Sequence, residues 1–339
     1  MSVHYVPWDT GLNMLKETER LYETAGTFNS IEKGDRVAIK IHVGELGTPY
    51  YVQPFFVHQI FQKVKDAGGK PFLTDTSTYY KGHRNDALDH METSVINGFN
   101  FAPFIISDGL IGENQITVRT KGLLEDVEVA GAIAKADAMI VVSHAKGHRI
   151  TGYGGAIKNL GMGCTSLAGK LRQHRTVGLE IDEGQCTGCG TCKEVCERNL
   201  PEIVDGKAVI DSPSCRRCPV CARNCPAGAI RLVGMEKLPM AIASAAYGVL
   251  STFDQKKVSY VSFAKDITQY CDCLANPGKV VMDDIGVLAS DSPVSIDAAF
   301  LKMAGYHITH DCDLDCMIQV KEARALGIEG DINPETEKI

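Results

Sequence analysis

The run Asp35-Arg-Val-Ala-Ile-Lys-Ile-His42 is rich in β-branched residues and predicts a strand. It is followed by helical periodicity from Gln53 to Ala67, which stops at Gly68-Gly69, and then by a second short strand, Lys70-Pro-Phe-Leu-Thr-Asp75. A strand, a helix and a strand in this order are typical of a βαβ unit, whose two strands lie parallel in one sheet. We therefore expect an α/β fold with a mostly parallel sheet and flanking helices.

The same alternation of helical and strand patterns extends along most of the chain. It is interrupted only by a segment, residues 181–232, that is rich in Cys, Gly and Pro and has little periodicity. The further elements that we expect are helices at 12–28, 129–135, 235–250 and 295–304, and strands at 102–108, 138–143, 257–264 and 279–282.

The composition of the 339 residues is that of a globular protein and argues against two classes of partner. A net charge of −7 argues against nucleic acid, because phosphate binding needs a basic face. The longest apolar segment, 238–250, is too short to span a bilayer. The N-terminal residues lack the basic region and apolar run of a signal peptide, so we expect a cytoplasmic protein without a membrane span.

Thirteen cysteines, many of them at spacings of three and four, indicate metal ligation rather than disulfide bonds. Cys186-x2-Cys189-x2-Cys192-x3-Cys196 is followed 19 residues later by Cys215-x2-Cys218-x2-Cys221-x3-Cys225-Pro226. In two-cluster ferredoxins of the bacterial type, the last cysteine of each motif binds the cluster held by the other motif. The ligand sets expected are Cys186, Cys189, Cys192 and Cys225 for one [4Fe–4S] cluster, and Cys215, Cys218, Cys221 and Cys196 for the other.

Zinc sites and a disulfide knot are the alternatives for these motifs. Zinc sites normally show paired Cys-x2-Cys elements, not three cysteines in register and a fourth nearby. Pro226 follows the fourth cysteine of the second motif as usual, whereas Glu197 stands at the corresponding position of the first. We expect a ferredoxin-like module with two [4Fe–4S] clusters at 181–232, inserted into an α/β domain formed by residues 1–180 and 233–339.

Polar residues gather where the predicted parallel strands end, and ligands of such sheets bind beyond those ends. His144 and His148, with Lys146 between them, are suited to acid–base chemistry, metal ligation or anion binding. For any single one of these residues, the alternative is an ordinary polar side chain at the point where a strand leads into a loop. The candidate catalytic residues are His42, Asp75, His144, Lys146 and His148.

A glycine-rich segment follows, Thr151-Gly-Tyr-Gly-Gly-Ala-Ile-Lys-Asn-Leu-Gly-Met-Gly163. Its glycines permit a ligand to approach the backbone closely, and Lys158 would attract a phosphate or a carboxylate. The segment is neither a Walker A motif nor a dinucleotide fingerprint, so it does not indicate a nucleotide. The candidate ligand-binding residues are Gly152, Gly154, Gly155 and Lys158, and a structural glycine-rich turn is the alternative.

Five cysteines lie outside the two cluster motifs. Cys271-Asp-Cys273 is suited to chelating a soft metal, alone or with Cys164 or a nearby His, or to a redox role, so a further metal ion is a candidate cofactor. A buried cysteine also behaves as a small hydrophobic residue, which is the alternative here. That second interpretation is the one we expect for Cys312 and Cys316, which are spaced by one helical turn.

Several motifs resemble those of the uncharacterised Fe–S-center proteins, domain-of-unknown-function family 362. They are His144-x-Lys-x-His148 leading into the glycine-rich segment, the inserted double Cys motif, Cys271-Asp-Cys273, and the stretch from Asp283 to Asp297. Together they span most of the chain. The glycine-rich segment is also similar to that of the nickel-pincer lactate racemases, in which His and Lys surround a cofactor, and no reaction follows from that similarity.

These patterns favour an oxidoreductase that passes electrons through two clusters to a ligand or metal at the strand ends. A carrier alone would need no large α/β domain. The alternative is a non-catalytic electron-transfer subunit whose α/β domain docks a partner enzyme. The partners expected are a redox protein, which is a ferredoxin or an enzyme subunit, and a small-molecule substrate.

Overall fold

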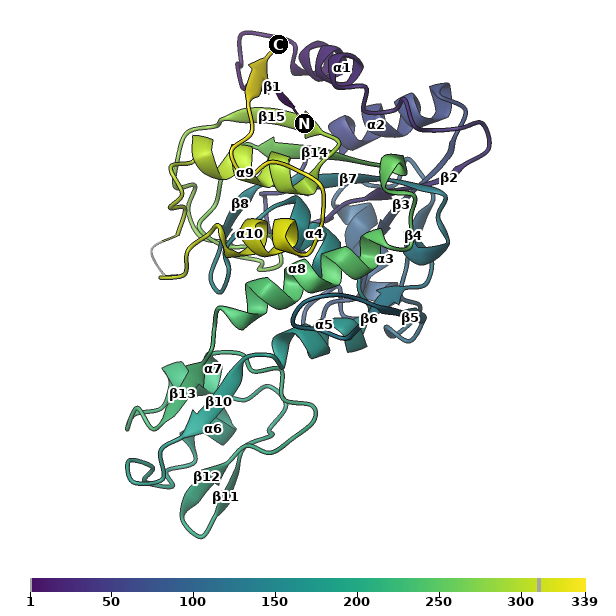
Figure 1. Cartoon of the computed structure of the whole chain (residues 1–339). Helices are drawn as coiled ribbons and strands as arrows, with labels where there is room; N and C mark the ends of the chain where they lie inside the picture. The colour runs from purple at the N-terminus through teal and green to yellow at the C-terminus, as the bar shows by residue number, and fades with distance from the viewer. Residues whose placement is uncertain (1, 310–311) are drawn as a thin grey trace.

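The computed structural model describes residues 2–309 and 312–339, and its centre is an eight-stranded sheet (Figure 1). The strand order is β16-β1-β15-β14-β7-β2-β3-β4, and β15 alone runs against the other seven. The expected α/β fold with a mostly parallel sheet is therefore confirmed. The strands are β1 (Val3–Pro7), β2 (Arg36–Lys40), β3 (Lys70–Asp75), β4 (Phe104–Ile106), β7 (Ala138–His144), β14 (Val258–Ala264), β15 (Gly286–Ser290) and β16 (Thr336–Lys338).

Helices cover both faces of the sheet. Alternate residues of the central strand β7 show this, because Met139 packs in one apolar cluster and Ile140 in the other. The first cluster includes residues of α4, α8, α9 and α10, and the second includes residues of α1 and α2. The helices are α1 (Met14–Ala25), α2 (Pro54–Asp66), α3 (Ala87–Ile96), α4 (Ala156–Gly161), α5 (Leu167–His174), α8 (Lys237–Leu250), α9 (Pro293–Met303) and α10 (Ile318–Ala325).

Two expected elements are wrong. Residues 129–135 form no α-helix, because the β-branched run at their start belongs to β6 (Asp126–Ala130), which pairs with β5 (Gln115–Arg119). Only the end of the range, Ile133–Lys135, is helical, as a single 3-10 turn. Residues 279–282 form no strand beyond one isolated bridge at Val280, which is 41% exposed. The strand in that region is β15, whose five residues are all buried, and the apolar alternation alone did not distinguish it from the preceding loop.

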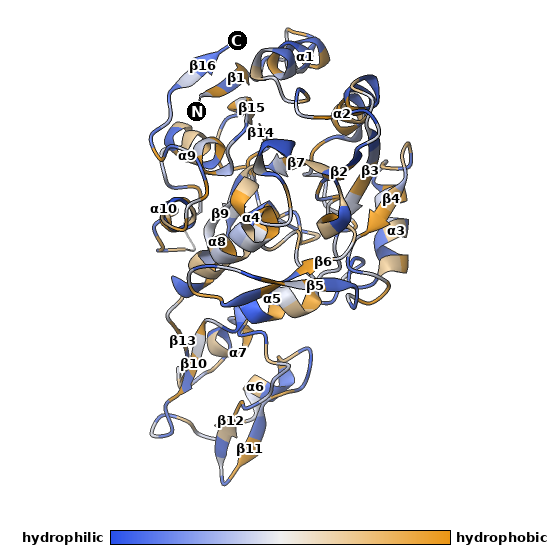
Figure 2. Ribbon diagram, turned by 45° about the vertical axis from the view of Figure 1, so that its right-hand side comes forward, coloured by the Kyte–Doolittle hydropathy of each residue, from blue (hydrophilic) through white to orange (hydrophobic). Residues whose placement is uncertain are grey.

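The Cys-rich segment is a separate unit that leaves the domain between α5 and α8 (Figures 1 and 2). Its ends lie side by side because β10 (Gly178–Ile181) pairs antiparallel with β13 (Ile230–Val233). The predicted limits, 181 and 232, fall on these two strands. We refer to residues 178–233 as the module. It also contains α6 (Thr191–Glu194), α7 (Val220–Arg223) and the hairpin of β11 (Glu202–Val204) and β12 (Lys207–Val209).

No helix in the described ranges has the length and the apolar character needed to cross a membrane.

Candidate functional site

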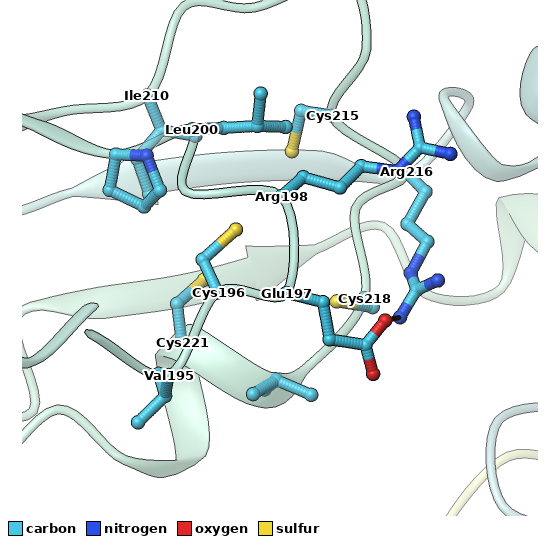
Figure 3. A pocket seen from close by; sticks show the side chains of 12 residues that line it. Val195, Cys196, Glu197, Arg198, Leu200, Ile210, Cys215, Arg216, Cys218 and Cys221 are labelled. Atoms are coloured by element: carbon cyan, nitrogen blue, oxygen red, sulfur yellow. Dashed lines mark hydrogen bonds and ion pairs between the residues drawn. The ribbon is translucent and has the colours of Figure 1, made fainter. Parts of the chain in front are cut away.

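The module contains two hollows, and the larger encloses about 490 Å³ of space that is partly open to solvent. Cysteines from both motifs line it, and the thiols of Cys196 and Cys215 point into it (Figure 3). Apolar side chains such as Leu200 and Ile210 form its wall. We call it the proximal cavity. Its cysteines are Cys196, Cys215, Cys218 and Cys221.

The second hollow, the distal cavity, encloses about 310 Å³ and is walled by residues such as Ile203 and Ile230. Within the described residues, no three His, Cys, Asp or Glu side chains are close enough to hold a single metal ion. Zinc would draw its sulfur ligands to about 2.3 Å from one centre, so four thiols around an open hollow fit a larger inorganic cluster better. The distal cysteines are Cys186, Cys189, Cys192 and Cys225.

A second site lies in the α/β domain, where the carboxyl ends of β2, β3 and β7 meet at one edge of the sheet. Asp75, the last residue of β3, accepts a hydrogen bond of 2.9 Å from Lys40 Nζ. Lys40 also donates to Asn159 Oδ1 at 2.8 Å, and Arg84 Nη1 donates to Asp75 Oδ2 at 3.4 Å. Burial alone would raise the pKa of Asp75, but Lys40 and His90 hold it well below its usual value.

Asp272 is a second fully buried carboxylate of this strand-end site. Its oxygens lie 2.9 Å from His144 Nδ1 and 3.1 Å from Lys146 Nζ. The other nitrogen of His144, Nε2, lies 2.7 Å from the carbonyl oxygen of Lys265. Burial would raise the pKa of Asp272, but the charges of His144 and Lys146 lower it. Two of the candidate catalytic residues are therefore held together by one carboxylate.

Because residue 147 is a glycine, the loop that carries Asp272 can pack closely against it. A Cβ on Gly147 would lie 2.3 Å from the carbonyl oxygen of Gln269, so any other residue would push β8 (Lys146–His148) away from the loop that carries Asp272. The Gly147 amide donates to Thr268 at 2.9 Å. This contact joins β8 to residues more than a hundred positions later in the chain.

The other two histidines of the site are poor bases. Burial and the charge of Arg84 hold the pKa of His42 well below its usual value. Burial and the charge of Lys158 do the same for His148, whose Nδ1 lies 2.9 Å from Thr151 Oγ1. Both rings are therefore neutral at pH 7, available as hydrogen-bonding groups rather than as cations.

The glycine-rich segment is mostly occupied by the protein's own side chains. A Cβ on Gly152 would meet Cys316 Sγ at 2.6 Å, and one on Gly155 would meet Asp297 Oδ1 at 2.3 Å. The Asp297 carboxylate accepts hydrogen bonds from two amides at the start of α4, and burial raises its pKa to about 6. Of the three candidate glycines, only Gly154, in β9 (Gly152–Gly154), faces the candidate cation Lys158, whose Cδ would lie 3.4 Å from its Cβ.

Cys271 and Cys273 flank Asp272 and lie in the same site. The backbone amide of Cys273 donates to Cys271 Sγ at 3.5 Å, and the two thiols hydrogen-bond each other. This bond lowers the pKa of Cys271 against the effect of burial, with help from Lys158 and Lys146. The hydroxyl of Tyr80 contacts Cys273 and accepts a hydrogen bond of 2.7 Å from Arg84.

Residues that line the proximal cavity contact Tyr79, the neighbour in sequence of Tyr80 in the strand-end site. Tyr79 donates a hydrogen bond of 3.1 Å to the carbonyl of Ser214, and the guanidinium of Arg198 lies 4.5 Å from its ring centre. Arg216 donates to the Tyr79 carbonyl at 3.4 Å. Ser214 and Arg216 flank the cavity cysteine Cys215. The module and the α/β site are thus joined at two consecutive tyrosines.

The sequence interpretation missed several residues of the strand-end site. Lys40 was a visible signal, because a lysine inside an apolar strand is rarely buried without a partner. Asp272 was visible between two cysteines but was not assigned a role. Arg84 carried no pattern, since it enters from a loop and is placed only by the fold. The residues missed are Lys40, Glu45, Tyr79, Tyr80, Arg84, Asn159 and Asp272.

Two curated relatives carry ferredoxin names. An uncharacterized ferredoxin of Methanocaldococcus jannaschii is 34% identical over 67 residues, which are 20% of this chain and 44% of that protein. A ferredoxin-like protein in the vnf region of Azotobacter chroococcum mcd 1 is 38% identical over 55 residues, which are 15% of this chain and 85% of that protein. The chain thus covers less than half of the archaeal ferredoxin and most of the second relative.

Fold and relatives together define a class, an α/β protein that carries a ferredoxin-like iron–sulfur module. Residues 37–302 match a family described as Domain of unknown function (DUF362). Because this match covers most of the chain, the protein belongs to that family, and the resemblance drawn from its motifs is confirmed.

Two solved structures align with about three quarters of this chain. The lactate racemase apoprotein from Thermoanaerobacterium thermosaccharolyticum aligns with a TM-score of 0.40 and 13% identity, over 78% of this chain and 51% of that chain. A protein from Thermotoga maritima aligns with a TM-score of 0.43 and 14% identity, over 76% of this chain and 52% of that chain. The chain therefore spans about half the length of each.

Proposed function

We propose that the protein holds two [4Fe–4S] clusters and passes electrons between them and the strand-end site, as an oxidoreductase. The observation that supports it most is the sorting of eight cysteines into two cavities, each with three from one motif and one from the other. Clusters held there would supply one-electron transfer. Thiolates from Cys215 and Cys196 would place one cluster next to Arg216 and Arg198, whose positive charges would favour the reduced, more negative state.

The α/β domain has features that a docking scaffold does not need. Buried charges cost several kcal/mol each to desolvate, and packed apolar residues would stabilise a scaffold equally well. Here the fully buried Asp75 and Asp272 hold Lys40, Arg84 and Lys146 at one edge of the sheet. Clusters of ionisable groups with shifted pKa values are typical of catalytic or binding sites.

A non-catalytic electron-transfer subunit is the second candidate, and one surface feature favours it. Apolar side chains of α3 and β4, at the end of the sheet, are exposed to between 41% and 69%. A contiguous exposed apolar face is typical of a protein-binding surface. The residues are Leu88, Met91, Val95, Ile96 and Ile105.

The first experiment is iron and sulfide analysis of anaerobically purified protein, with EPR of the dithionite-reduced form. We expect about eight iron and eight sulfide per chain. Cys218→Ser, in the proximal cavity, should lose about half of the iron, and Cys189→Ser, in the distal cavity, the other half. Cys164→Ser, a buried cysteine outside both cavities, is the matched control and should keep all of it. Wild-type iron below four per chain after reconstitution would refute the two clusters.

A second measurement separates the two functions. If the strand-end site is catalytic, Lys146→Met and Asp272→Asn should keep the iron content and EPR spectrum but abolish turnover with any substrate found by screening. If the protein only carries electrons, these variants should reduce a partner protein at the wild-type rate, and Met91→Asp on α3 should slow that reaction.

A further inference from the structure

Cys271 and Cys273, here called the thiol pair, have no part in either cluster cavity. Cys271 is 6% exposed and Cys273 is partly buried, and the two thiols hydrogen-bond each other. Asp272 between them is fixed by His144 at 2.9 Å and Lys146 at 3.1 Å. The pair is therefore held on one short, anchored turn, in which the amide of Cys273 donates to Cys271 Sγ at 3.5 Å.

The surroundings of the thiol pair are positively charged. Lys146 and Lys158 act on Cys271, and Lys158 and Arg84 act on Cys273. Within residues 2–309 and 312–339, the Lys158 side chain forms no hydrogen bond or ion pair, although its backbone carbonyl accepts from the amides of Met162 and Gly163. Among the described residues, no third His, Cys, Asp or Glu side chain joins the thiol pair in an arrangement that could hold a metal ion. The charges of Lys158 and Lys146 help to lower the pKa of Cys271, which favours its thiolate, the reactive form in disulfide exchange. The hydrogen bond to Cys271 and burial raise the pKa of Cys273 well above its usual value, so Cys273 is the protonated partner.

The thiol pair also lies on the side of the domain that meets the proximal cavity. Tyr80 contacts Cys273, and its neighbour Tyr79 hydrogen-bonds Ser214, the residue before Cys215. A continuous covalent and hydrogen-bonded path thus leads from Cys215 through Tyr79 and Tyr80 to Cys273. Of the two cavities, the proximal one is the one in contact with this path.

We propose that Cys271 and Cys273 form a reversible disulfide that exchanges two electrons with the iron–sulfur module. This inference rests on the proposed function, because the electrons come from the clusters. Each reduced cluster gives one electron; the two electrons break the S–S bond, two protons from solvent complete two thiols, and both clusters are left oxidised. The clusters are reduced again by an external low-potential electron carrier. The thiol pair would convert one-electron transfer into the two-electron form that most substrates require.

The test measures the oxidation state of Cys271 and Cys273 rather than a catalytic rate. Anaerobic, cluster-loaded protein is treated with oxidised glutathione, desalted, and alkylated before and after two electron equivalents are delivered to the clusters by dithionite. Peptide mass spectrometry should show Cys271 and Cys273 protected and two hydrogens lighter after oxidation, and both alkylated after reduction. The variant Cys215→Ser/Cys218→Ser lacks two of the proximal ligands. In this variant, Cys271 and Cys273 should stay protected from alkylation over the same period. Cys312 and Cys316, a second close pair of the same chain, are the internal control and should not change.

Three results would overturn the proposal. The first is free alkylation of both thiols after oxidation while the iron content is intact. The second is equally rapid reduction of the pair in Cys215→Ser/Cys218→Ser. The third is a metal ion that co-purifies with the protein and is lost in Cys271→Ser. Iron content is measured on every sample, so a missing cluster is recognised separately as a failure of the proposed function.

Discussion

The module and the strand-end site each gather reactive side chains, but they are built in opposite ways. The ligands of the module come from one stretch, 186–225, and converge because of short spacings. The strand-end site collects Lys40, Asp75 and Asp272, which are up to 232 residues apart. Only the completed sheet brings them together. The module therefore carries its chemistry in local sequence, and the domain carries its chemistry in the fold.

The same contrast holds for what stabilises each part. The apolar cluster of the module has seven buried members, and three of them are cysteines. The α/β domain has two large apolar clusters on the two faces of its sheet. A small unit with so little apolar core usually depends on a bound metal or on disulfides. We infer that the domain folds by its own packing and the module by its clusters.

The largest expected effect tests this difference directly. Replacing Cys189, Cys192, Cys218 and Cys221 by Ser should remove both clusters, and amide hydrogen exchange across 178–233 should lose nearly all protection. Protection in β7 and β14 should stay at the wild-type level, because both strands are buried in the domain core. A loss of protection in both parts would show that the module supports the domain after all.

The contrast also explains what could be read from the sequence. The eight cysteines could be divided into two candidate ligand sets because a cluster needs thiolates at short spacing. His144, Lys146 and Asp75 could be proposed as neighbours because parallel strands end at one edge. Arg84 and Asp272 were assigned no role, since each reaches the site from a loop whose path depends on the whole fold. Strand β15 was missed because its apolar run was not distinguished from the loop that precedes it.

The second effect concerns the buried ions of the domain. Lys40 is 1% exposed and neutralises Asp75, so Lys40→Met should lower the free energy of unfolding of the domain by about 3 kcal/mol. The remaining charge of Asp75 would still be shared with Arg84, which limits the loss. Urea denaturation followed by far-UV circular dichroism measures it. The matched control is Arg20→Met, which breaks an exposed pair with Glu17 and should change stability by less than about 0.5 kcal/mol. Equal losses in the two variants would contradict the buried network.

The third effect is a pH dependence at the junction of the two parts. Burial, Lys158 and Arg216 lower the pKa of His174 to about 4. Between about pH 4 and pH 6.5 the unfolded chain then binds more protons than the folded one, so this contribution to stability is complete above pH 6.5 and is lost as the pH falls to 4. Because the His174 ring is partly exposed, solvent screening reduces the effect of this pKa shift on stability. His174→Gln should therefore remove about 1–2 kcal/mol of the decrease in the free energy of unfolding at low pH. The difference between variant and wild type is measured by urea denaturation at pH 4.5, 5.5 and 8. This difference separates the contribution of His174 from those of other groups that titrate, such as Asp297. A difference that does not vary with pH would refute the lowered pKa of His174.

The smallest effect asks how tightly the two parts are coupled. Tyr79→Phe removes the hydroxyl that donates to Ser214 and accepts from Arg198, but keeps the ring against which the Arg198 guanidinium packs. Each lost hydrogen bond is worth about 0.5–1.5 kcal/mol, so loss of the two should lower local protection of 212–218 by at least about fivefold while the cluster content stays constant. Tyr79→Leu, which also removes the ring, should lose more, because a cation–π contact adds about 0.5–1 kcal/mol at a partly exposed site. Hydrogen exchange on cluster-loaded protein measures both variants. If neither changes protection at 212–218, the module is held only by the paired strands β10 and β13, and the path from Tyr79 to Cys273 loses its structural support.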